Sequence, residues 1–127
     1  MPEFMFFIRK QRNSEASLSA EVHEKFLKSC ERYINSLKKD GKLISAQPIE
    51  WVGKIISSSG GSWKAQPFDE LGEVIGGYYH IRANDLEEAV SLAKANPEFE
   101  YNRDTRIEVR AIKTKETTTG FVYPKKD

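Results

Sequence analysis

Few side chains in this chain of 127 residues could bind a soft metal, and the histidines among them could also act as acids or bases near neutral pH. They are two histidines, His23 and His80, and one cysteine, Cys30. Zinc sites use paired cysteines or closely spaced histidines, and neither spacing occurs here. We therefore expect no metal site and no other cofactor, and the two histidines become the main candidates for chemistry.

His23 falls in the first turns of a helix that we predict over residues 19–40, with Ser19 as its N-cap. It shares a helical stripe with Leu27 and Cys30, so it faces whatever the helix covers. A neutral imidazole in that place can act as a general base or accept a hydrogen bond. The alternative is a boundary histidine half covered by packing. We predict that His23 binds a ligand first and serves as a catalyst second.

His80 belongs to a strand predicted over residues 74–82, which lacks the clean apolar–polar alternation of a sheet wet on one side. We place the face with Ile75 and Tyr79 against helices and the face with Tyr78 and His80 against a second layer. On that second face, His80 lines a ligand pocket with Tyr78, or else it is a core histidine hydrogen-bonded to its surroundings.

The order of the predicted elements is that of an α+β, ferredoxin-like split βαβ unit with an inserted hairpin. The domain covers residues 1–113, and residues 114–127 form a polar tail. The remaining elements are a strand at 4–9, a strand at 42–46, a hairpin at 51–66, a helix at 85–95 and a strand at 106–113.

Three local patterns add detail to these elements. Asn84 is a possible N-cap of the second helix, with Glu87 at the capping-box position, and Leu86 begins the apolar stripe. Trp51 and Trp63 stand on the two arms of the hairpin, where they could pair across it or shape a ligand cleft. Residues 98–105 are predicted to be a loop.

Charge and cysteine content limit the classes of partner and compartment. The formal net charge is +1, which argues against direct binding to nucleic acid, since that requires a basic surplus. The apolar run 4–8 is too short to cross a membrane or to serve as a signal sequence, so we expect no membrane partner. A single cysteine fits a reducing compartment, and we expect a cytoplasmic protein.

Several blocks of the sequence together resemble one known family. They are Phe4–Ile8, Gly41-Lys42-Leu43 with Pro48, Leu71 with Gly76-Gly77-Tyr78-Tyr79-His80-Ile81, Asp85-Leu86-Glu87-Glu88-Ala89, and Ile107–Arg110. This pattern is similar to the YCII-related family, in its branch named for an Asp-Gly-Pro-Phe motif. The resemblance implies a homodimeric α/β barrel, in which two ferredoxin-like units join their uncovered sheet faces and form a cleft.

The chain departs from that branch at the motif itself. It reads Ala65-Gln66-Pro67-Phe68, so the position of the aspartate holds a residue that cannot ionise. Some relatives carry a histidine–aspartate pair, and the region of their histidine corresponds to His23. The change at Ala65 therefore weakens the expectation of acid–base catalysis, while Pro67 and Phe68 keep the turn and its apolar side chain.

These observations lead to one principal hypothesis for function and two alternatives. The principal one is a homodimeric domain with a cleft for an unknown small molecule, lined by His23, Gln66, Phe68, Tyr78 and His80. The resemblance also allows a lyase or isomerase, dehydrochlorinase-like, with His23 as general base on a small organic acid and Glu73, Tyr78 or His80 as second group. It further allows a protein-interaction module linked to transcription initiation.

Overall fold

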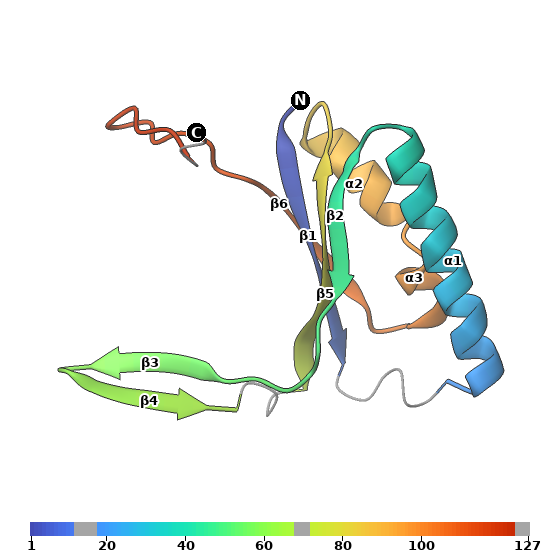
Figure 1. Ribbon diagram of the computed structural model, residues 1–127, viewed down its shortest axis with the longest axis horizontal. Coiled ribbons are helices and arrows are strands. Elements are labelled where there is room, and N and C mark those ends of the chain that lie inside the picture. Colours follow the sequence, from blue (N-terminus) through green and yellow to red (C-terminus); the bar gives the residue numbers. More distant parts are fainter. Residues whose placement is uncertain (12–17, 68–71, 124–127) are drawn as a thin grey trace.

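The computed structural model describes residues 1–11, 18–67 and 72–123, and the chain runs through six strands and three helices within them (Figure 1). In chain order these elements are β1 (Glu3–Gln11), α1 (Ala20–Lys39), β2 (Leu43–Pro48), β3 (Ile55–Ser59), β4 (Ser62–Gln66), β5 (Glu73–Arg82), α2 (Leu86–Lys94), α3 (Glu98–Tyr101) and β6 (Arg106–Ala111).

Four of the strands form one antiparallel sheet in the order β2-β5-β1-β6, and β3 and β4 form a separate hairpin. The helices all lie on one side of the sheet, and the hairpin extends from the opposite side (Figure 1). This arrangement confirms the predicted α+β, ferredoxin-like unit with an inserted hairpin. No helix in the described part of the chain is both long and apolar enough to cross a membrane.

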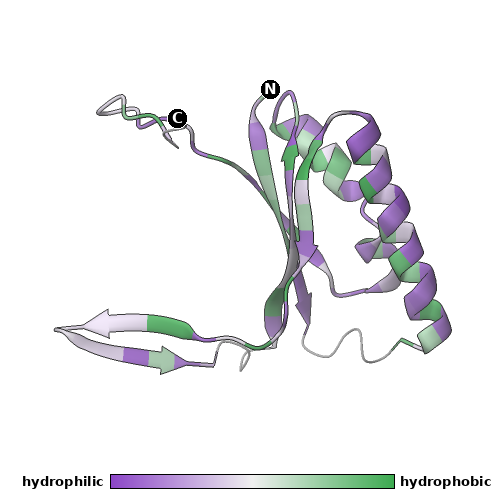
Figure 2. Ribbon diagram, viewed as in Figure 1, coloured by the Kyte–Doolittle hydropathy of each residue, from purple (hydrophilic) through white to green (hydrophobic). Residues whose placement is uncertain are grey.

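The hydrophobic core lies between the sheet and the helices. Alternation along β1 sends Phe4, Phe6 and Ile8 to the helix side, and all three are almost fully buried. Tyr79 and Ile81 of β5 join them, and small residues of α2, Ala89 and Ala93, let that helix approach closely. Figure 2 shows that α1 carries both hydrophilic and hydrophobic residues along its length.

The opposite side of the sheet, which we call the bare face, carries Met5, Phe7, Tyr78 and His80. In the register of β1 and β5, Met5 is opposite His80 and Phe7 is opposite Tyr78. These side chains are neither fully buried nor fully exposed in the single chain. The expectation that Tyr78 and His80 share the face away from the helices is therefore confirmed.

One residue of β5 lies on the other face from the one expected. The pairing shifts between Ile8 and Arg9, whose partners are Gly77 and Ile75, so Gly76 forms a bulge. An extra residue in one strand exchanges the two faces beyond it. Val74 is consequently buried, whereas Ile75 is 43% exposed, and its predicted place beside Tyr79 against the helices is wrong.

The N-cap predicted for the first helix is confirmed, and the N-cap of the second helix lies one residue later than predicted. The hydroxyl of Ser19 accepts a hydrogen bond from the Val22 N–H at 3.2 Å, as expected for an N-cap. The second helix is capped by Asp85 and not by Asn84, because the Asp85 carboxylate accepts from the Glu88 N–H at 2.8 Å. Leu86 then points outward and is 53% exposed.

The hairpin and the segment after α2 also differ from expectation. The hairpin begins at Ile55, so Trp51 lies before it, and Trp63 is opposite Ser58. The predicted pairing of Trp51 with Trp63 across the hairpin is therefore wrong. The predicted loop 98–105 begins with the short helix α3.

The Glu88 carboxylate gives the fold a measurable dependence on pH. It accepts a hydrogen bond from the Asn84 N–H at 2.9 Å and lies 3.1 Å from the Lys42 ammonium. The hydrogen bond from Asn84, followed by that from Lys42, lowers the pKa of Glu88 below its ordinary 4.5. A lowered pKa in the folded state stabilises the fold above pH 4.5, and this contribution is lost as the pH falls below the ordinary pKa.

We expect Glu88→Gln to lower the melting temperature at pH 7 and to reduce the loss of stability on acidification, measured by thermal unfolding from pH 7 to pH ~3. Glu87→Gln, at the exposed neighbouring position, is the matched control. Parallel pH profiles for wild type and Glu88→Gln would contradict the assignment.

Candidate ligand-binding site

A groove with a volume of about 460 Å³ lies between α1 and the sheet. Its wall on the helix side carries His23, Phe26, Leu27, Cys30 and Ile34. Its floor is formed by Ile8 and Lys10 of β1, by Gly76 to Tyr79 of β5, by Ala46 to Pro48 of β2 and by Glu98 at the start of α3.

The groove exists because α1 meets the core closely at only some of its inward positions. Phe26 and Leu37 are 3% exposed, whereas Leu27, between them, is 52% exposed. Opposite the helix, Gly76 and Gly77 carry no side chains that could fill the space. The helix is thus held off the sheet where the glycines lie, and an apolar hollow remains.

Gly77 also allows β2 to approach closely. A Cβ atom placed on Gly77 would lie 3.1 Å from the carbonyl oxygen of Gln47, which is backbone and cannot move aside easily. At Gly76 the corresponding atom would lie 3.1 Å from Cδ of Lys10. Glycine at these two positions therefore admits close neighbours, as glycine inside a strand often does.

The deep end of the groove holds a buried ion pair. Lys10 is 3% exposed, and its Nζ lies 3.1 Å from Oε1 of Glu98, which is 8% exposed. The same ammonium lies 5.4 Å from the centre of the Phe26 ring, within the range of a cation–π contact. Two opposite charges therefore compensate each other beside an otherwise apolar hollow.

The carboxylate of this pair is fixed by its own neighbours. Nδ2 of Asn102 donates to Oε1 of Glu98 at 3.1 Å, and the Glu98 N–H donates to Oδ1 of Asn96 at 2.9 Å. Asn96 is 2% exposed, and its Nδ2 has no hydrogen-bond partner among the residues that the structure describes. The short helix α3 thus supplies the anion that a lysine on the core side of β1 requires.

Tyr79 of the groove packs against a second tyrosine, Tyr33 of α1. Tyr33 and Tyr79 meet edge to face with ring centres 5.5 Å apart, and the Tyr33 hydroxyl donates to the Leu92 carbonyl at 2.6 Å. Burial raises the pKa of both Tyr33 and Tyr79 above the ordinary value. They remain neutral phenols at physiological pH and act as hydrogen-bonding or packing groups, not as bases.

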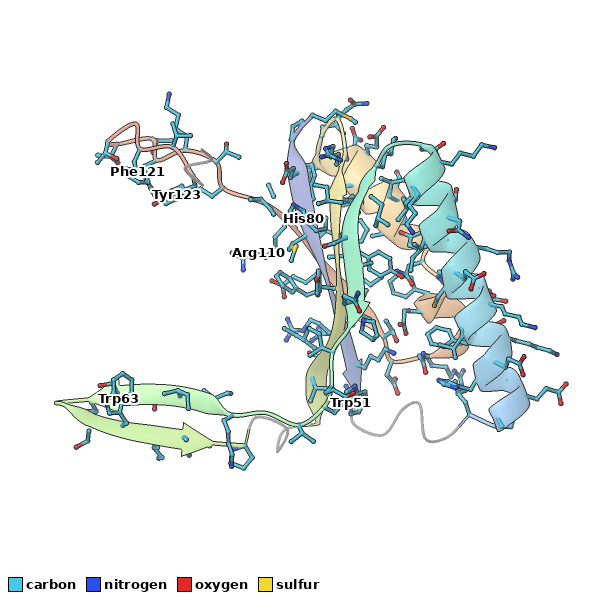
Figure 3. The ribbon with its side chains drawn as sticks, viewed as in Figure 1. Trp51, Trp63, His80, Arg110, Phe121 and Tyr123 are labelled. Atoms are coloured by element: carbon cyan, nitrogen blue, oxygen red, sulfur yellow. The ribbon has the colours of Figure 1, made fainter. Side chains whose placement is uncertain are left out.

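The structure brings together only some of the predicted site residues. His23 lines the groove, with its ring 6.2 Å from that of Phe26. Tyr78 borders the groove as part of β5, although its side chain belongs to the bare face. His80 lies on the bare face, where its Nε2 is 2.7 Å from Oε1 of Glu3 (Figure 3). Gln66 belongs to the exposed hairpin, and Phe68 lies outside the described residues.

Sequence reasoning missed Lys10 and Glu98. Lys10 lies beyond the strand predicted at 4–9, yet it continues the alternation of Phe4, Phe6 and Ile8 on the buried side of β1. The sequence did contain a signal for this, because Lys10 follows Phe4, Phe6 and Ile8 at the two-residue spacing of one strand face. Nothing comparable marks Glu98, because its burial depends on how α3 folds back under α1. The described residues contain no group of three or more side chains able to hold a metal ion.

Comparison with known proteins identifies the family. The sequence profile of the YCII-related domain matches residues 4–116. This chain belongs to the YCII-related domain family. No curated protein matches it.

Two solved structures are similar to this YCII-related domain. One is 5-chloro-2-hydroxyhydroquinone dehydrochlorinase (TftG) from Burkholderia phenoliruptrix AC1100, in complex with 2,5-dihydroxybenzoquinone. It is 18% identical, with 84% of this chain and 90% of that chain covered and a TM-score of 0.45. The other is the de novo designed protein LFR1 1 with a ferredoxin fold, 11% identical, with 99% and 96% covered and a TM-score of 0.37.

The ion pair at the deep end of the groove predicts an asymmetric response to mutation. Lys10→Met leaves a buried carboxylate without its cation and should cost about 3–5 kcal/mol of unfolding free energy. The double variant Lys10→Met/Glu98→Gln should recover most of that loss, because the glutamine keeps an oxygen for Asn102. Denaturant unfolding monitored by circular dichroism measures both.

The exposed pair of Lys25 with Glu21, 3.8 Å apart on α1, provides the matched control. Lys25→Met should change the unfolding free energy by less than about 0.5 kcal/mol. Similar costs for Lys10→Met and Lys25→Met would show that the Lys10–Glu98 contact is not a buried pair in solution.

Proposed function

We propose that this YCII-related domain binds a small organic molecule in the groove between α1 and the sheet. The observation that carries the proposal is the hollow itself: about 460 Å³ of mainly apolar surface with a few polar groups. Ligand sites in proteins commonly have volumes of roughly 300–1,000 Å³ and this mixture of lining groups. A packed core around His23 would have favoured the interaction-module alternative.

The lining groups restrict the chemistry of the ligand. Rings and aliphatic side chains such as Phe26 and Ile34 suit an apolar or aromatic body. At the deep end, Lys10 and Glu98 already compensate each other, so an extra net charge there would meet one group of like sign. A neutral group that both donates and accepts hydrogen bonds suits that end best.

His23 supplies a second polar contact at the wall formed by α1. No hydrogen bond joins its ring to another described residue, within 1–11, 18–67 and 72–123, so its ring nitrogens can bond to a ligand. It is the fourth residue of α1, and its backbone N–H donates to the carbonyl of the N-cap Ser19 at 2.9 Å, so its place in the first turn of the helix is fixed. This is the role proposed for His23 in preference to catalysis.

Replacing His23 tests this role once thermal-shift screening has returned a ligand. His23→Ala should weaken binding by about 1–3 kcal/mol, the scale of a buried polar group left unpaired, which is roughly 5- to 150-fold in dissociation constant. His23→Gln keeps a donor and an acceptor and should retain much of the affinity, measured by isothermal titration calorimetry.

His80→Gln is the matched control, because it changes the second histidine of the chain on the opposite side of the sheet. It should leave the affinity unchanged. Equal affinities of wild type and His23→Ala, or a comparable loss in His80→Gln, would exclude the proposed contact.

A catalytic role is the second candidate, favoured by the presence of Lys10 and Glu98 in the groove that His23 lines. In a lyase or isomerase reaction His23 takes a proton from the substrate, and the Lys10 ammonium stabilises the negative charge that develops. Loss of turnover in His23→Gln with binding retained would separate this candidate from binding alone.

We further propose a homodimer through the bare face. Met5, Phe7 and Tyr78 would otherwise present an apolar band to water, and such a band on a monomer is an aggregation hazard. Light scattering at micromolar concentration should give twice the mass of the chain. A monomer at that concentration would refute the dimer without affecting the binding proposal.

A further inference from the structure

The β3–β4 hairpin, residues 55–66, has one apolar side and one polar side. The register places Ile56 opposite Ala65 and Ser58 opposite Trp63. Cross-strand partners and alternate residues share a side, so Ile56, Ala65 and Trp63 form one surface together with the small residue Ser58. The other surface carries Ile55, Ser57, Ser59, Ser62, Lys64 and Gln66.

No part of the described chain covers that apolar side. Every residue of β3 and β4 is exposed, with Ile56 at 58% and Trp63 at 76%. A two-stranded hairpin alone in water is at best marginally stable. An amphipathic hairpin of this kind therefore requires a surface to lie on.

The position of the hairpin indicates where that surface is. Figure 1 shows the hairpin extending away from the helices, on the same side of the sheet as the bare face. The segment after β6, with Phe121 and Tyr123 in ring contact, extends on that side as well, at the other end of the sheet (Figure 3). A body docked on the bare face would lie between these two projections.

The charges beside the bare face favour a second copy of this chain as that body. Arg9 and Arg106 both contact Glu73, at 2.9 Å and 2.8 Å, and Arg9 and Arg110 contact Glu108, at 3.0 Å and 3.8 Å. These three arginines and two glutamates leave one positive charge in excess, but the face carries both signs and can offer carboxylates as well as guanidinium groups to an identical face. A self-complementary surface is what a two-fold dimer requires.

The reach of the hairpin fits the same geometry. Five residues of extended strand span roughly 17 Å, and stacked sheets lie about 10 Å apart. A hairpin that leaves the bare face therefore passes the sheet of a docked partner and continues beside its helices.

We propose that each hairpin acts as an arm that clasps a second copy, with Ile56, Ala65 and Trp63 packed on the partner's flank. This inference rests on the homodimer proposed above and adds a second contact surface to it.

Two substitutions that add the same charge, one on each side of the hairpin, test which side contacts the partner. Ala65→Asp puts a charge on the apolar side and should raise the dimer dissociation constant at least about tenfold, since an unpaired charge would be buried. Ser57→Asp puts the same charge on the polar side and should leave it unchanged. Analytical ultracentrifugation gives both constants, and equal effects of the two variants would overturn the proposal.

Tryptophan fluorescence tests the arm without a change in the hairpin. The chain has two tryptophans, so Trp51→Phe leaves Trp63 as the only one. Its emission should be blue-shifted in the dimer and should move to the red as dilution separates the copies. A dimer whose Trp63 emits as a fully exposed indole overturns the arm while leaving the dimer intact, whereas a monomer overturns both.

Discussion

The alternation of β1 is the constraint on which the groove depends. It places Phe4, Phe6 and Ile8 in the core and then brings Lys10 to the same side. A buried ammonium is tolerated only with a partner of opposite charge, and Glu98 of α3 supplies it at 3.1 Å. The end of the core nearest this pair therefore holds two charged groups and, at Gly76 and Gly77, no side chains, and the groove lies there.

The two sides of the sheet have separate tasks in this account. The helix side contains the groove, with His23 on its wall and the ion pair at its deep end. The bare face and the hairpin are the surfaces proposed for assembly, and His80 is held on the bare face beside Glu3. The Gly76 bulge lies where the two meet, since it exchanges the faces of β5 and leaves room for the stem of Lys10.

The sequence predicted the fold well because its elements have strong local signals. Helix α1 has an N-cap at Ser19 and a clear stripe, and the order of strands and helices determined the ferredoxin-like unit. The errors occurred where a shift of one residue decides which way a side chain points. A bulge of one residue moved Ile75 to the other face, and a cap one residue later turned Leu86 outward.

The site was harder to predict than the fold. His23 was found from helical spacing, but its partners in the groove come from segments far apart in sequence. Glu98 approaches Lys10 only through the fold of α3, and no local pattern marks such a contact. His80 was placed on the correct face, yet that face lies across the sheet from the groove.

The most direct test of the binding groove is a proton NMR titration of the imidazole signals. The two histidines contribute one Hε1 signal each, and the variants His23→Gln and His80→Gln assign these signals. Titration with the molecule that gives the largest thermal shift should move the His23 signal and leave that of His80 in place. Movement of the His80 signal alone, or of neither signal at saturation, would contradict a ligand site between α1 and the sheet.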